Sequence, residues 1–179
     1  EDVNGDNVID GNDLKAMGNP STPQLIYGFS PSISYKGFDV NVLFQGAGAG
    51  SFYLSGQAAW PFENGASALA TNLDYWTPHN TNARYPIILS QPSANTRQTS
   101  DWWLRKSNYM RLKSAEVGYT LPQTIMSKIK LQMIRVYASG QNLVTWTKDM
   151  KDFDPEASDT RGQFYPQQKV ITFGLNVTC

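Results

Sequence analysis

A run of aspartate and asparagine residues opens the sequence, and its spacing is suited to binding a hard cation. Side-chain oxygens recur along the run, and the backbone carbonyl of Val8 adds one more. Calcium takes six to eight oxygen ligands, and alternate residues on a tight loop can direct their oxygens at one ion. The spacing therefore predicts a calcium site. Its candidate ligands are Asp2, Asn4, Asp6, Val8, Asp10 and Asp13.

Two residues depart from the usual calcium-loop pattern, and a second interpretation stays open. Asn7 stands where a glycine usually makes the sharp turn, although asparagine tolerates the left-handed conformation. Asp13 replaces a longer glutamate, so its carboxylate reaches less far. Alternatively, such segments form turns in which the side chains bond to their own backbone. In either interpretation the run is structural and not catalytic.

Five aromatic residues in the middle of the chain could bind a sugar by stacking. Flat π surfaces suit the C–H faces of sugar rings. Two commoner roles fit the same residues, namely packing within a loop and an aromatic girdle at a membrane interface. The candidate ligand-binding residues are Trp60, Tyr75, Trp76, Trp102 and Trp103.

Catalytic groups are scarce in this sequence. His79 is the only histidine, so neither a serine triad nor a His-pair metal site can be assembled. Asp152 and Asp154 could act as an acid–base pair, but nothing positions them across a cleft, and we expect solvated loop charges. The only cysteine is Cys179, which excludes an intrachain disulfide. The sequence therefore predicts no enzyme.

The charge balance argues against a nucleic-acid partner. The 15 basic and 15 acidic residues cancel, whereas nucleic-acid binding needs a basic face. Charged residues make up only 17% of the chain, below the usual value of about 25%. The apolar runs are far shorter than the roughly 18 residues of a spanning helix. A membrane barrel remains compatible with the composition, because its strands are short and half apolar.

A period of two predicts the elements that carry these residues. Residues 24–35 alternate between an apolar and a polar face, a turn follows at 36–37, and the alternation resumes over 38–45. Residues 109–120 form a third strand, in which a bulge near Lys113 would bring both halves into one phase.

The connections between strands differ in length. Residues 46–108 have no lasting period and are predicted to form one very long loop. A helical turn at 125–130 precedes a fourth strand over 131–146, and a fifth strand covers 171–178. Short turns alternating with long loops are typical of outer-membrane barrels. An odd number of strands places the two chain ends on opposite sides of a membrane, so these strands make only part of a barrel.

Nine phrases, taken in order, resemble the C-terminal portion of SusC/RagA-family TonB-dependent transporters. They span nearly the whole chain at suitable separations. The phrases are EDVNGD (1–6), YKGFD (35–39), DYWTP (74–78), NARYP (82–86), SNYMRLK (107–113), EVGYTLP (116–122), RVYASGQNL (135–143), DPE (154–156) and YP (165–166).

The resemblance implies an all-β fold, with antiparallel strands from the C-terminal end of a large transmembrane β-barrel and long extracellular loops. Residues 1–22 would form an extracellular loop with the calcium-type motif, and residues 23–179 would supply about five strands of a barrel of about 22, which holds a plug. The final strand resembles a barrel-assembly signal, although Cys179 stands where that signal has an aromatic residue.

The resemblance also implies a function. The parent protein would lie in the outer membrane of a Gram-negative bacterium, in contact with lipid, and would import glycan or peptide fragments. A SusD-like surface lipoprotein would act as its lid, and TonB would supply energy through other parts of the parent chain. The alternative is a soluble, secreted calcium-binding β module that grips carbohydrate, but this alternative leaves the alternating loop lengths unexplained.

Overall fold

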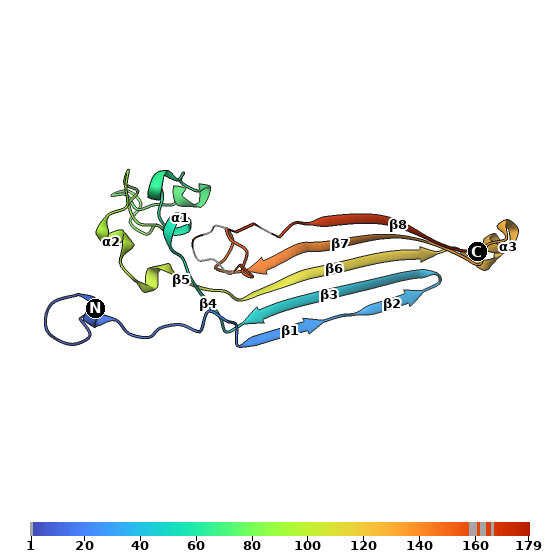
Figure 1. The fold of residues 1–179 in the computed structure, drawn as a ribbon, viewed down its shortest axis with the longest axis horizontal. Helices are drawn as coiled ribbons and strands as arrows, with labels where there is room; N and C mark the ends of the chain where they lie inside the picture. The colour runs from blue at the N-terminus through green and yellow to red at the C-terminus, as the bar shows by residue number, and fades with distance from the viewer. Residues whose placement is uncertain (1, 158–160, 162–163, 166) are drawn as a thin grey trace.

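The computed structural model describes residues 2–157, 161, 164–165 and 167–179. One long antiparallel sheet extends through the molecule, with a cluster of loops at one end and a short helix at the other (Figure 1). The N-terminal segment lies at the loop end, and the C-terminus lies at the helix end. The two chain ends are therefore at opposite ends of the sheet, as the odd number of predicted strands requires.

The sheet contains six strands in the order β1-β3-β6-β7-β8, with β2 also paired to β3. The predicted strand over 24–35 is interrupted at Ser30 and Pro31, so it forms two elements that both pair with β3. Proline lacks the N–H that a ladder requires. The strands are β1 (Leu25–Phe29), β2 (Ser32–Tyr35), β3 (Phe38–Gly48), β6 (Tyr109–Thr120), β7 (Met133–Thr147) and β8 (Val170–Thr178).

Strand register sorts the side chains onto two faces of opposite character. One face pairs apolar residues across neighbouring strands, for example Val40 with Val117 and Leu175 with Val136. The other face pairs polar residues, such as Glu116 with Ser139. The apolar face is bare. Its most exposed members include Phe29, Ile33, Tyr35, Phe38, Ile171, Phe173 and Leu175.

The predicted bulge at Lys113 is confirmed. Both neighbours of β6 change register here, because Leu112 pairs with Phe44 and Val144 whereas Ser114 pairs with Leu43 and Gln141. The extra residue shifts the alternation by one, which places the apolar residues of both halves of β6 on one face.

The helix end of the sheet has short connections, as predicted. Lys36 and Gly37 form the tight turn between β2 and β3 with φ of 47° and 86°. A Cβ on Gly37 would come within 2.7 Å of the Thr120 carbonyl oxygen. The predicted helical turn is α3 (Gln123–Ile129), which buries Met126 completely. No helix in the described part of the chain has the length and apolar character to cross a membrane.

The predicted very long connection is present between β3 and β6, but it contains short helices and strands that the lack of a period did not predict. We call residues 49–108 and 148–157 the loop cluster. Aromatic residues without a regular period pack there into a small core. The cluster contains β4 (Ser51–Tyr53), α1 (Gly56–Ala59), η2 (Glu63–Gly65), η3 (Ala70–Leu73), α2 (Ala94–Arg97), η4 (Asp101–Trp103) and β5 (Leu104–Lys106), and η1 (Gly11–Asp13) lies before it.

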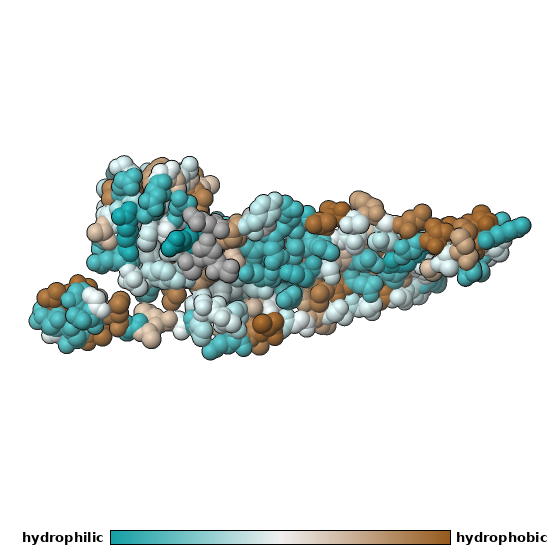
Figure 2. All heavy atoms as spheres, viewed as in Figure 1, coloured by the Kyte–Doolittle hydropathy of each residue, from teal (hydrophilic) through white to brown (hydrophobic). Residues whose placement is uncertain are grey.

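Buried hydrophobic packing is concentrated in the loop cluster and not in the sheet. The sheet is a single layer, so its side chains have no second layer to pack against (Figure 1). Hydrophobic side chains gather along β8 and toward the α3 end, while hydrophilic ones cover the middle of the visible face (Figure 2). The core of the loop cluster consists of Phe52, Leu54, Ala59, Tyr85, Trp103 and Met150.

Candidate functional site

The aromatic residues singled out in the sequence have two different environments in the loop cluster. Trp103 is only 3% exposed, and its Nε1 donates to the Thr96 carbonyl oxygen at 3.2 Å. Trp60 and Tyr75 are partly buried and pack against the same core. These three side chains therefore do what the commoner interpretation expects of loop aromatics, which is packing.

Trp76 and Trp102 differ because each keeps much of its surface exposed, 40% and 48% respectively. Both line a groove of about 520 Å³, and one edge of Trp103 also reaches it. Amide side chains of Asn95 and Gln98 border the same groove. A flat apolar ring surface beside hydrogen-bonding groups is the combination that recognises sugars and aromatic side chains. Sugar binding by these residues stays a prediction.

The groove also adjoins the Asp-rich loop formed by residues 2–13. The sequence alone could not reveal that the groove and this loop are neighbours. Ile9 contributes to its lining. A second hollow of about 390 Å³ lies between this loop and the segment around η4, with Val3 and Asp13 on one side and Thr99 and Asp101 on the other. The predicted metal loop and the predicted aromatic site are therefore neighbours in space.

Within the Asp-rich loop, the carboxylates accept hydrogen bonds from backbone amides. Asp2 receives the amides of Gly5 at 2.7 Å and Asn7 at 2.8 Å, which lowers the pKa of its carboxyl, chiefly through the bond from Asn7. Asp13 receives the amide of Asp10 at 2.8 Å, and this bond is the main cause of its lowered pKa. Such contacts are typical of an Asx-rich turn.

The structure confirms that Asn7 adopts the left-handed conformation at the sharp turn, with φ of 66°. The side chains of Asn4 and Asp6 bond to amides two residues ahead, at 2.9 Å and 2.8 Å. Among the described residues, no three histidine, cysteine, aspartate or glutamate side chains are grouped so as to hold a metal. Calcium in this loop therefore stays a prediction.

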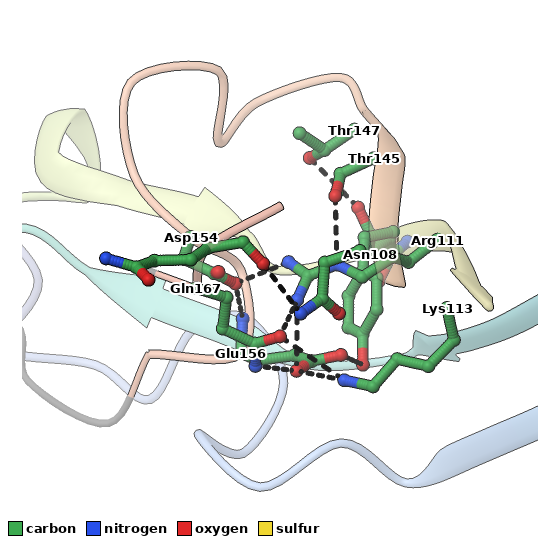
Figure 3. A network of polar contacts seen from close by, with 11 residues as sticks. Asn108, Arg111, Lys113, Thr145, Thr147, Asp154, Glu156 and Gln167 are labelled. Carbon is green, nitrogen blue, oxygen red and sulfur yellow. Dashed lines mark hydrogen bonds and ion pairs between the residues drawn. The ribbon is translucent and has the colours of Figure 1, made fainter. Parts of the chain in front are cut away.

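A buried arginine fastens the loop cluster to the polar face of the sheet (Figure 3). Arg111 of β6 is 2% exposed. Its guanidinium donates to Asp154 Oδ1 at 2.7 Å, to Gln167 Oε1 at 2.6 Å and to Thr145 Oγ1 at 2.9 Å. A fourth contact, 3.2 Å long, reaches Glu156 Oε2. Charge-assisted contacts of this kind are stronger than neutral ones.

Neighbouring side chains extend this network. Tyr109 donates to Glu156 Oε1 at 2.8 Å, and Lys113 Nζ donates to Glu156 Oε2 at 3.2 Å. Burial raises the pKa of Glu156, but the hydrogen bonds from Tyr109 and Lys113 outweigh this effect and hold the pKa below its ordinary value. Asp154 is thus part of a buried network, so the expectation that it is a solvated loop charge was wrong. The DPE phrase and the MRLK phrase, far apart in sequence, meet here.

A second charged group lies on the polar face nearer the helix end. Arg135 of β7 donates to Asp39 and, at 2.7 Å, to Glu116 Oε1, joining β3, β6 and β7. Neither arginine was predicted from the sequence to have this role. The signal was present, because Arg111, Glu116 and Arg135 all occupy polar-phase positions of predicted strands, where opposite charges on neighbouring strands can pair.

Comparisons with known proteins show what this chain is similar to. No family model matches the chain. Two curated proteins of Formosa agariphila are similar to the chain in sequence. TonB-dependent receptor P3 is 32% identical over 98% of this chain and 18% of its own length, and TonB-dependent receptor P26 is 31% identical over 99% and 19%. The chain thus spans about a fifth of the length of the curated relatives it matches.

Solved structures agree with the sequence relatives. The RagAB peptide importer in its closed-closed state matches with a TM-score of 0.73 at 27% identity, over 96% of this chain and 19% of that one. The open-open state matches with a TM-score of 0.67 at 26% identity, over 90% and 18%. The antiparallel fold of a transporter barrel segment is therefore confirmed. The resemblance to SusC/RagA-family TonB-dependent transporters, expected from the nine phrases, is confirmed with it.

Proposed function

We propose that this chain forms part of the wall and outer mouth of a TonB-dependent nutrient importer in the outer membrane of a Gram-negative bacterium. The observation that carries the proposal is the bare apolar face of the sheet, where Phe173 is 80% and Ile33 67% exposed. Strands with one apolar and one polar face suit a barrel that meets lipid outside and a polar lumen inside. Lipid would cover the face that the chain itself leaves open.

The proposal extends to substrate and partners. The curated relatives are named TonB-dependent receptors, and the solved neighbours are titled peptide importers. By analogy, TonB would drive import through other parts of the parent chain, and a SusD-like surface lipoprotein would cover the mouth. Oligosaccharide or peptide fragments would meet the groove of Trp76 and Trp102 first. Import requires no covalent step, so no catalytic residue is assigned.

The soluble carbohydrate-binding module is the weaker candidate. Soluble monomers rarely expose a contiguous apolar patch of more than a few hundred Å². Here most of the apolar side chains of the six strands face the same way, because the register aligns them across the whole sheet. A soluble protein would have to cover that face with another layer.

A pair of cysteine substitutions tests the proposal in the full-length parent protein. With Cys179→Ser as background, Leu175→Cys on the apolar face of β8 is compared with Asn176→Cys on its polar face. We expect a lipid-soluble maleimide to label position 175 in outer-membrane vesicles, and a water-soluble maleimide to label only position 176. Labelling of position 175 from water would contradict the proposal.

Uptake provides the functional readout. Cells that carry the parent protein should accumulate its oligosaccharide or peptide substrate only when TonB is present. Uptake that persists unchanged without TonB would contradict the proposed import function, even if the two cysteine variants were labelled as expected.

A further inference from the structure

A cationic pocket lies beside the aromatic groove of the loop cluster. It has a volume of about 660 Å³ and lies between β5 and the segment 148–151 that follows β7. Four cationic side chains line it, against two carboxylates, those of Asp101 and Asp149. The four are Arg84, Arg105, Lys148 and Lys151.

The positive charges of the pocket are only partly balanced. Arg84 has a distant partner, because its guanidinium is 3.8 Å from Asp152. Over the described part of the chain, neither Lys148 nor Lys151 forms an ion pair. Because the cationic side chains in the lining outnumber the carboxylates by four to two, the hollow keeps a positive potential.

Arg105 is the most constrained cation of the four. Its guanidinium donates to two backbone carbonyls, those of Trp102 and, at 3.2 Å, Leu104, which fix it in place. The carboxylate of Asp149 acts on it through charge alone. Burial, and secondarily the positive charge of Arg84, lowers the pKa of Arg105. The surroundings therefore disfavour its charge, and an anion in the pocket would relieve this.

Trp102 connects the pocket with the groove, because this residue contributes to the lining of both. A molecule whose ring stacks on Trp102 can thus direct one substituent toward the cations and another toward Asn95 and Gln98. Ring stacking with hydroxyl recognition by amides fits a sugar better than an extended acidic peptide.

We propose that this pocket binds the anionic substituent, a carboxylate or a sulfate ester, of an acidic oligosaccharide whose sugar ring stacks on Trp102. The inference rests on the proposed import function and narrows its substrate class. Lys148 and Lys151 attract the anion, Arg105 holds it at the floor of the pocket, and Trp102 fixes the ring. Charge would select acidic over neutral sugars, because a neutral ring leaves the cations without a counter-charge.

Calorimetric titration of the full-length parent protein in detergent tests this assignment. The probes are trigalacturonate, a sulfated galactan tetrasaccharide, neutral galactotriose and triglutamate. We expect one of the acidic sugars to bind at least tenfold more tightly than galactotriose, with an affinity that falls as salt is raised. The carboxylate and sulfate arms show which anion is preferred.

Charge-matched variants locate the binding. Lys148→Gln with Lys151→Gln should weaken the acidic sugar about tenfold and leave galactotriose unchanged, since two charge contacts are lost. Lys128→Gln with Lys130→Gln, at the opposite end of the sheet, removes the same charge and should change nothing. Trp102→Ala should weaken both sugars, because stacking does not depend on charge.

Three outcomes would overturn the inference: equal binding of acidic and neutral sugars, tighter binding of triglutamate than of either acidic sugar, or a Lys148 and Lys151 double variant that binds as the unaltered protein does. Each of these leaves the importer proposal intact if uptake still requires TonB. Uptake that is independent of TonB, together with selective binding of an acidic sugar, would instead contradict the proposed import function and support the proposed anion-binding pocket.

Discussion

Arg111 shows how one side chain can organise a loop. It is buried on the polar face of β6 and bonds to Asp154, Glu156 and Gln167 of the segment that precedes β8. That segment also carries Met150 into the core of the loop cluster and Lys148 into the cationic pocket. The position of the proposed anion site therefore depends on a residue that does not line it.

Replacing Arg111 with methionine should release this segment. The change keeps an unbranched side chain about as long as the arginine stem but leaves Asp154 and Glu156 without their main cation, and breaking such a buried pair costs about 3–5 kcal/mol. We expect proteases added to intact cells to cut near residues 148–157 much faster than in the unaltered protein. Lys128→Gln, far from the network, should leave the cutting rate unchanged. An unchanged rate for Arg111→Met would mean that the network does not hold the loop.

The loop formed by residues 2–13 combines the calcium-type spacing of its aspartates with the required sharp turn at Asn7. We propose calcium binding with a dissociation constant of about 0.1–1 mM, the range of extracellular modules. Calorimetry should detect it in the parent protein, and Asp13→Ala should abolish it. Asp101→Ala, an exposed neighbour outside the loop, serves as control. No heat with the unaltered protein would leave only the Asx-turn interpretation.

Acid should loosen the same loop. Asp2 and Asp13 have pKa values lowered from the ordinary 3.8 by backbone amides. Their stabilising effect is fully present above the unfolded value and is lost as the pH falls through the lower folded value. The protection factors of the amides of Asn7 and Asp10 against hydrogen exchange, which correct for the intrinsic pH dependence of exchange, should therefore fall below the ordinary carboxyl pKa and stay constant between neutral pH and that point. Loss of protection that begins near neutral pH would contradict this assignment.

The placement of the β6 side chains on the two faces of the sheet depends on the bulge at Lys113. Without the extra residue at 113, every side chain from Ser114 to Thr120 would change face. Glu116 would then turn from its bond with Arg135 toward the apolar side.

Deleting Lys113 should therefore prevent assembly, whereas Lys113→Ala, which keeps the chain length, should allow it. The measurement is heat-modifiable mobility of the parent protein on gels of outer-membrane preparations, which distinguishes folded barrels from unfolded chains. The loss expected for the deletion reflects a charged residue placed in lipid, together with a broken ladder on both sides of β6. Equal folding of the two variants would show that the bulge is dispensable.

At the scale of the whole molecule, the sheet is a single layer whose apolar face has no cover within the chain. Outside a membrane or detergent, we expect residues 2–179 to aggregate through that face and through the open edges at β1 and β8. Size-exclusion chromatography with and without detergent would detect this. A monodisperse species in plain buffer would instead favour the soluble module.

The sequence by itself determined the strands, their two faces, the bulge at Lys113 and the tight turn at Lys36 and Gly37. These features depend on residues that are adjacent in the chain, so a period of two and a turn signal reveal them. The interruption at Pro31 was also present in the sequence, but the alternation continued across it and concealed the break.

Only the tertiary structure decided which loop residues meet. The contacts of Arg111 with Asp154 and Gln167, the sharing of Trp102 between groove and pocket, and the burial of Trp103 all join positions far apart in the chain. Such contacts exist because the paired strands bring their ends to one edge of the sheet, where aperiodic loops pack by shape. No local pattern in the sequence encodes that packing.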